Sequence, residues 1–195
     1  MTDLRPGPTP VDAQLVALAR DVAAHVEDYL SALQAIARDG DAGSSVPLLL
    51  LELGQISLTG ARLGAQVDIR PEQEYQPDVG PEADLDELRL RLAQILGGVD
   101  TYSFVFDPYD PDVVDSQLSD DLTSIASDLE NGMRHLRDGN VAEALWWWQF
   151  SYVSSWGNLA GAALNALWSI VHHDRLDTDV TVDEDQVEAA IEILG

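Results

Sequence analysis

The chain has 195 residues, which suits one domain with a sizeable core. Thirty-five acidic residues against ten arginines and no lysine give a formal net charge of −25, and a field this negative repels phosphate backbones, so we expect no direct binding to nucleic acid. The chain holds no cysteine, which excludes disulfides, thiolate metal sites and cysteine nucleophiles.

The beginning of the chain predicts a tail followed by two helices. Residues 1–8 are predicted to be a flexible N-terminal tail, and residues 9–175 a helical bundle domain. In the first helix, capped by Thr9, apolar residues recur at steps of three and four up to Gly40. The second helix, about residues 45–64, is apolar around most of its circumference, so we expect it to be buried on nearly all sides.

A narrow polar line along this second helix contains two candidate site residues, Glu52 and Arg62. A glutamate inside LLLLELG needs a partner if it is buried, and Arg62 is about 15 Å further along the helix. We therefore expect a partner from another helix, either Arg134 or His135. The pattern fits a structural buried network, or a carboxylate poised for catalysis or metal binding.

The middle of the chain predicts one helix between two loops. The proline-punctuated residues 65–83 are predicted to be a loop that is functional or mobile, and a third helix follows from Asp84 to about Val99. In TYSFVFDPYDPD, residues 101–112, aromatic residues alternate as in a strand. No partner strand is evident, so we predict a helical turn that runs into a proline-bounded loop.

The last third of the chain predicts two further helices and a short terminal one. The fourth helix covers residues 119–139, and the fifth runs over residues 140–172 as one straight helix unless it bends at Gly157. The uncharged part of the fifth helix is long enough to span a bilayer, but it contains polar side chains and lacks basic flanks, so we predict a central buried helix and no membrane span. Residues 176–195 are predicted to be an acidic C-terminal segment with a short helix. The predicted fold class is all-α, an antiparallel helical bundle of five to six helices.

The fifth helix carries most of the candidate binding residues. Trp146, Trp147 and Trp148 are adjacent, and because successive helical positions are about 100° apart, their side chains cannot share one face. Either neighbours enclose the helix, or one tryptophan reaches a pocket or an interface. Steps of four and three place these candidates on one line: Trp147, Ser151, Asn158, Trp168 and His172. That line suits a ligand cleft or a polar seam satisfied by neighbouring helices. A second line is predicted to pack into the core: Trp148, Tyr152 and Trp156.

Motifs of common enzyme classes are absent from the sequence. It contains no HExxH, Walker loop, GxGxxG or G-x-S-x-G motif, and no paired Glu-x-x-Glu as an all-helical pyrophosphohydrolase would use for Mg²⁺. We therefore expect no metal site and no cofactor.

Three strings carry a family resemblance: VPLLLLELGQISLTGARLGA, VDTYSFVFDPYDP and SDDLTSIASDLENGMRHLRDGNVAEALWWWQFSYVSSWG. Together they resemble the actinobacterial domain of unknown function 5063 family over about residues 11–175, and EALWWWQFSY is the most specific part. The resemblance implies an intracellular helical domain. It implies no activity and carries over no catalytic residue.

The sequence therefore predicts a non-catalytic helical module of the bacterial cytoplasm that binds a protein partner or forms a homodimer. The alternative is a small-molecule or metal-dependent enzyme with a polar site between the second and fifth helices, built from Glu52, Arg62, Asn158 and His172. A basic protein partner, a divalent cation or solubility alone would each explain the acidity.

Overall fold

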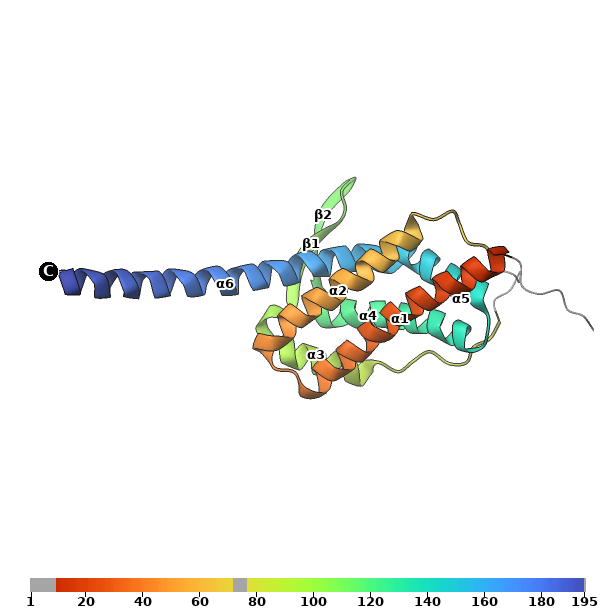
Figure 1. Cartoon of the computed structure of the whole chain (residues 1–195), viewed down its shortest axis with the longest axis horizontal. Helices are drawn as coiled ribbons and strands as arrows, with labels where there is room; N and C mark the ends of the chain where they lie inside the picture. Colours follow the sequence, from red (N-terminus) through yellow and green to blue (C-terminus); the bar gives the residue numbers. More distant parts are fainter. Residues whose placement is uncertain (1–9, 72–76, 195) are drawn as a thin grey trace, which may run out of the picture.

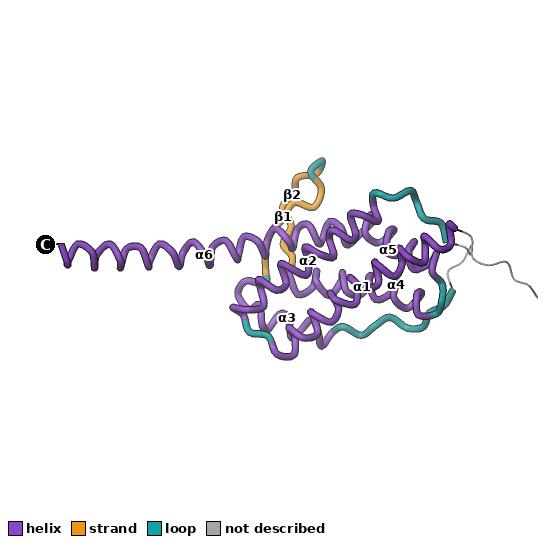
Figure 2. Tube along the Cα trace, in the orientation of Figure 1, coloured by secondary structure: helices purple, strands orange, loops and turns teal. Residues whose placement is uncertain are grey.

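The computed structural model describes residues 10–71 and 77–194, and helices make up most of them (Figures 1 and 2). The α-helices of this part are α1 (Pro10–Asp39), α2 (Ala42–Gly64), α3 (Asp86–Leu96), α4 (Leu118–Arg137), α5 (Val141–Ser151) and α6 (Gly157–Leu194). Their number and packing confirm the predicted helical bundle. The predicted tail, residues 1–8, lies outside the described residues.

The first two helices form an antiparallel pair with a very short connection. The amide of Gly40 donates to the carbonyl of Ile36 at 2.7 Å and closes α1. The Asp41 carboxylate then accepts from the amides of Gly43 and Ser44 at 3.0 and 3.2 Å, so Asp41 is the N-cap of α2. This cap starts α2 three residues before the predicted start.

The core fills the space between α1, α2, α4, α5 and α6. Its members on α1 and α4 recur at helical spacing, as predicted, and they include Val22, Val26, Tyr29, Leu33, Leu122, Ile125, Leu129 and Met133. The Tyr29 hydroxyl donates to the carbonyl of Leu122 at 3.1 Å, which satisfies a buried polar group between α1 and α4. In α2, only one face is fully buried, because Leu48, Leu51 and Leu58 remain about half exposed. The expectation of a helix buried on nearly all sides is therefore wrong.

Two glycines allow bulky aromatic side chains to approach a neighbouring helix. A Cβ on Gly132 of α4 would overlap the indole of Trp148, whose Nε1 donates to the carbonyl of Leu129 at 2.9 Å. A Cβ on Gly60 of α2 would overlap Trp156 and Tyr152. Small residues at these points let the large rings fill the core without pushing the helices apart.

Residues 101–117 form a β-hairpin, so the predicted helical turn and loop are wrong. Strand β1 (Thr101–Asp107) pairs antiparallel with β2 (Asp110–Gln117), and the two make a sheet of two strands. The alternation of aromatic residues in β1 indicated a strand correctly. Its partner was missed because β2 is rich in aspartate and begins with Asp110 and Pro111, residue types that are depleted in strands. In Figure 1 the hairpin crosses α6 and stands out from the helices.

The predicted fifth helix is interrupted, and the predicted terminal helix is part of it. Five residues, Tyr152–Trp156, form a π-helical segment between α5 and α6, immediately before Gly157, where the sequence left a bend open. α6 then continues as one helix to Leu194, with no break where a separate helix was predicted to start. Figure 1 shows its C-terminal part extending well beyond the other helices.

One described helix, α2, is long and apolar enough to cross a bilayer, over Gly43–Gly64. This result depends on length and composition, which the core helix of a soluble protein also satisfies.

Candidate functional site

The two predicted site residues of α5 are engaged in internal hydrogen bonds. The half-buried Trp147 donates from Nε1 to the carbonyl of Asp128 on α4 at 2.9 Å. The buried Ser151 donates from Oγ to the carbonyl of Trp147 at 2.7 Å. Trp147 therefore bonds to a neighbouring helix, as expected of a polar seam, whereas Ser151 bonds to a carbonyl of its own helix.

The three predicted site residues of α6 lie beyond the π-helical segment. Asn158 donates from Nδ2 to the carbonyl of Phe106 in β1 at 2.8 Å. The exposed Trp168 stacks on His172, with ring centroids 5.2 Å apart. A π-helical turn takes an extra residue and rotates everything after it, so the single line expected from Trp147 to His172 does not exist.

On α2, the buried network expected around Glu52 is absent among the described residues. Burial raises the pKa of the partly buried Glu52 carboxyl, and the carboxylate of Asp28 on α1 adds to the shift. Arg134 instead donates to loop carbonyls of Gly80 and Pro81, and Arg62 is exposed. The predicted partnership of Glu52 with Arg134 is therefore wrong.

The other proposed partner, His135, lies beside a different carboxylate. Burial lowers the pKa of His135, and the nearby Glu143 carboxylate opposes this effect. The seven predicted site residues thus fall into separate local contacts. None of them lines any of the four surface hollows described for residues 10–71 and 77–194.

Sequence reasoning missed a polar cluster that anchors the base of the hairpin. The buried Asp121 carboxylate accepts from the Tyr102 hydroxyl at 2.6 Å and from the Ser116 hydroxyl at 3.0 Å. Asp100 accepts from the amide and the hydroxyl of Ser119 at 2.8 and 2.9 Å. Burial raises the pKa of Asp121, and the hydrogen bonds from Tyr102 and Ser116 oppose that rise. Both carboxylates lie at the N-terminus of α4, where the helix dipole stabilises negative charge.

Above this base, the hairpin and α6 enclose an uncharged cleft of about 390 Å³. Its lining combines aromatic and small apolar side chains with a few hydroxyl and amide groups: Tyr102, Phe104, Ala162, Asn165, Ala166 and Ser169 are among them. The side chains of Tyr102 and Phe104 are half-buried here, and their rings stack 5.6 Å apart. This packing holds the inner face of β1 against α6.

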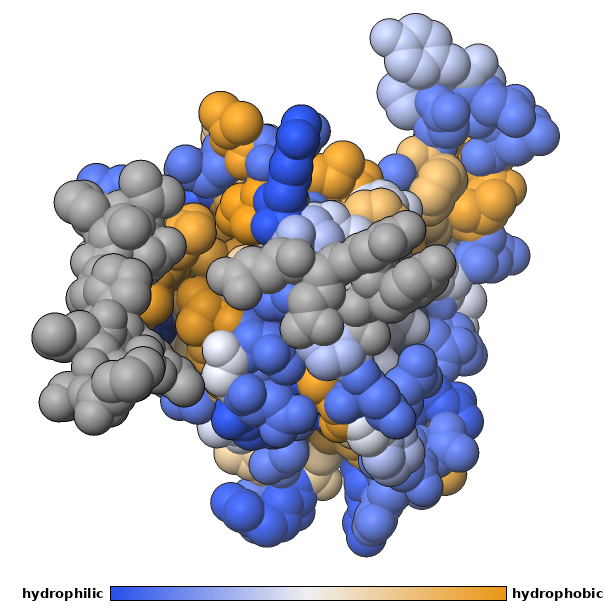
Figure 3. Space-filling model, turned by 90° about the vertical axis from the view of Figure 1, so that its right-hand side faces the viewer, coloured by the Kyte–Doolittle hydropathy of each residue, from blue (hydrophilic) through white to orange (hydrophobic). Residues whose placement is uncertain are grey.

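The distal part of the hairpin is an exposed arm, which we define as residues 105–115. Tyr109, Val113 and Phe106 expose 97%, 68% and 50% of their surface, so these apolar side chains contribute little to the core. Figure 3 shows an arm standing out at the upper right of the molecule, with hydrophobic and hydrophilic residues side by side. An exposed, partly apolar projection of this kind is typical of an interaction surface.

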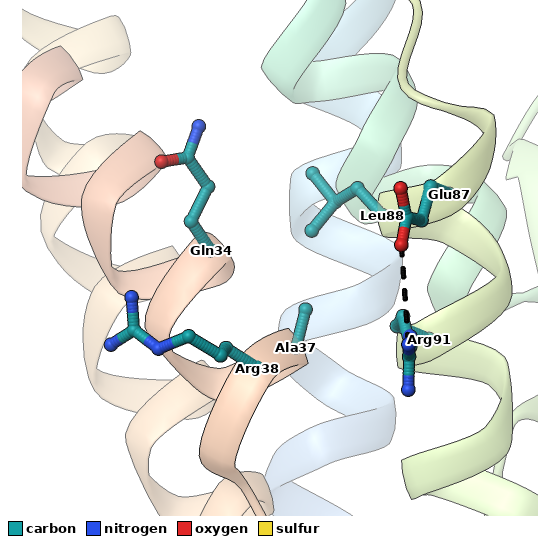
Figure 4. A pocket seen from close by; sticks show the side chains of 6 residues that line it. All are labelled: Gln34, Ala37, Arg38, Glu87, Leu88 and Arg91. Atoms are coloured by element: carbon teal, nitrogen blue, oxygen red, sulfur yellow. Dashed lines mark ion pairs between the residues drawn. The ribbon is translucent and has the colours of Figure 1, made fainter.

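A second hollow, of about 300 Å³, lies between α1 and α3 (Figure 4). Gln34, Ala37 and Arg38 of α1 line one side of it, and Glu87, Leu88 and Arg91 of α3 line the other. Arg38 pairs with Asp39 at 2.7 Å, and Arg91 lies 4.0 Å from Glu87. Both guanidinium groups thus already have a carboxylate partner, which makes this hollow a weaker candidate than the arm.

The family described as "Domain of unknown function (DUF5063)" matches residues 14–173. No curated protein matches the chain significantly. The crystal structure of protein BF1032 from Bacteroides fragilis is similar, with a TM-score of 0.61 and 17% sequence identity, covering 76% of this chain and 89% of that one. Similarity at this level of identity shows a shared fold.

Proposed function

We propose that this chain, which belongs to the DUF5063 family, is a non-catalytic interaction module that binds a protein partner through its hairpin arm. The supporting observation is the arm itself, whose apolar residues Phe106, Tyr109 and Val113 are at least half exposed. Large apolar side chains that project into solvent in this way are available to pack against a partner.

The anchoring of the hairpin supports a binding role. Hydrogen bonds fix its base at Asp121, and Asn158 holds the carbonyl of Phe106. The arm is therefore presented in a defined position, which reduces the entropy lost when a partner binds. An isolated two-stranded hairpin is marginally stable in water, so this anchoring is needed to keep the arm formed.

The catalytic alternative has less support. Glu52, Arg62, Asn158 and His172 make separate contacts, whereas catalysis requires polar groups that converge around one reacting centre. We also infer that the module acts in the cytoplasm of an actinobacterium. An all-arginine set of basic residues, as expected from a GC-rich genome, supports this origin.

Because the natural chain has no cysteine, a single introduced cysteine can be labelled specifically. Val113→Cys on the arm is labelled with a cysteine-reactive photo-crosslinker, mixed with host lysate and irradiated, and the adducts are identified by mass spectrometry. Ala24→Cys, at an exposed position of α1, is the matched control. We expect a discrete partner adduct from Val113→Cys and none from the control. Identical adducts from both positions, or no adduct, would overturn the proposal, and an adduct of two copies would replace the partner with a homodimer.

A further inference from the structure

The outer edge of β2 is the accessible edge of the hairpin sheet. β1 lies beside α6, where Asn158 donates to the carbonyl of Phe106 at 2.8 Å. Among residues 10–71 and 77–194, β2 pairs with β1 alone, and residues 110–115 are all exposed. Unpaired backbone amides and carbonyls along a strand edge form a ready template for another strand.

The negative charge of the hairpin determines which kind of strand can pair with the edge of β2. The hairpin has four aspartates, Asp107, Asp110, Asp112 and Asp115, and no basic residue. In the register that aligns the valines, a second copy pairing through the same edge would set aspartates opposite aspartates, and like charges directly opposite each other are destabilising. The aspartates also attract lysine and arginine side chains. They therefore disfavour pairing between two copies of this chain and favour pairing with a basic segment.

The order of side chains along β2 defines the pattern of that segment. Asp112, Val113, Val114 and Asp115 follow one another, with Val113 opposite Val105 and Val114 opposite Phe104 in the existing pair. Side chains alternate between the two faces of the sheet, so each face carries one valine and one aspartate of this stretch. A strand added beside β2 therefore gains most from two adjacent apolar residues with a basic residue on each side.

We propose that the edge of β2 binds an extended, basic segment of another protein as a third strand. Its apolar side chains lie beside Val113 and Val114, and its lysine or arginine side chains lie beside Asp112 and Asp115. Main-chain hydrogen bonds supply part of the affinity and the side-chain pairs supply the selectivity. This inference rests on the proposed interaction function and specifies the chemistry of the partner.

The probe is a capped eight-residue peptide with a Lys-Val-Val-Lys centre, titrated into the full chain and followed by NMR. The control peptide has the same side chains and charge but N-methylated backbone amides, which cannot pair with a strand edge. We expect the first peptide to bind, with shifts and slowed amide exchange concentrated in β2, and the N-methylated peptide to bind at least tenfold more weakly. Equal binding of the two peptides, or shifts outside the hairpin, would overturn strand addition.

Two double variants distinguish the effect of the β2 aspartates on peptide binding from the effect of the overall negative charge. In D112N/D115N, the amide group that replaces the Asp115 carboxylate keeps an oxygen that can accept from the Ser103 hydroxyl, so the hairpin is expected to remain formed. We expect the dissociation constant to rise about 2- to 30-fold, from the loss of two opposite-charge cross-strand pairs. D21N/E27Q removes the same charge from exposed positions of α1 and should change it less than twofold. Equal effects in both variants would attribute binding to overall acidity. If Val113→Cys captures a partner while no strand peptide binds, strand addition fails and the interaction function stands.

Discussion

Trp148 and Trp156 are a matched pair that tests the hydrogen bonding of the core. Both indoles are buried, at 0% and 1% exposure. Trp148 donates from Nε1 to the carbonyl of Leu129 at 2.9 Å, whereas Nε1 of Trp156 has no partner among the described residues. Replacing each with phenylalanine removes the same ring atoms, so the cavity contribution is similar at the two positions.

The two variants should therefore differ in unfolding free energy mainly because of the two indole N–H groups. Trp148→Phe loses a hydrogen bond with a usual net value of about 0.5–1.5 kcal/mol, whereas Trp156→Phe removes an unpaired buried donor that costs about 1–3 kcal/mol. Trp148→Phe should therefore be the more destabilising by about 1.5–4.5 kcal/mol. Urea melts measure this difference, provided that the slope m is unchanged between variants. Equal losses at the two positions would refute the reasoning, because they would mean that Trp156 has a partner such as a buried water.

Alanine substitutions on the same helical segment test which tryptophans belong to the core. Trp156→Ala should destabilise the fold by about 3–5 kcal/mol, the usual effect of deleting a buried large aromatic side chain. Trp147→Ala should lower the free energy of unfolding clearly less than Trp156→Ala, because Trp147 is only half-buried. The same urea melts compare the two. An equal loss for Trp147→Ala would show that this side chain is enclosed as completely as Trp156.

Gly132→Ala should destabilise the fold by about 1–3 kcal/mol, because its Cβ would overlap Trp148, whereas Gly161→Ala, with open space around it, should stabilise α6 by about 0.5–1 kcal/mol. Thermal melts that fail to show opposite signs would contradict the packing argument. Burial raises the pKa of Asp121 above its ordinary 3.8, so the folded state binds this proton more tightly than the unfolded state. The protonated carboxyl therefore stabilises the fold at low pH, and this stabilisation is lost as the pH rises through the pKa of the folded state. The melting temperature of Asp121→Asn relative to the natural chain should thus increase from about pH 4 to about pH 7, and a constant or decreasing difference would count against it. Finally, mutual repulsion among 35 carboxylates should make the melting temperature rise with NaCl from very low salt, and a fall would mean that attractive ion pairs dominate.

The helical part of the fold was accessible from the sequence because its signals are local. The spacing of Val22, Val26 and Tyr29 follows the 3.6-residue period of a helix, and this period alone identifies the buried face of α1. The burial of Trp148 and Trp156 was predicted in the same way. The cap at Asp41 was missed by a few residues, since several neighbouring polar residues are equally suitable caps.

The candidate site depends on contacts that no local pattern contains. The strand period of β1 was visible, but β2 becomes a strand only because it pairs with β1 and because Tyr102 and Ser116 bind Asp121 on α4. The π-helical segment, in turn, broke the line on which the predicted site depended. A single extra residue in one turn rotates all later side chains, and sequence spacing assumes a regular turn throughout.

The sequence by itself therefore determined the helices, the buried face of α1 and the negative charge, because periodicity, composition and charge are properties of short stretches of chain. Only the tertiary structure decided the hairpin, its exposed edge, the surroundings of Glu52 and the hydrogen-bond partners of Asn158 and Asp121. Those features depend on tertiary contacts between segments that are far apart in the chain. Burial and hydrogen bonds across these contacts supply their free energy, and no local propensity contains it.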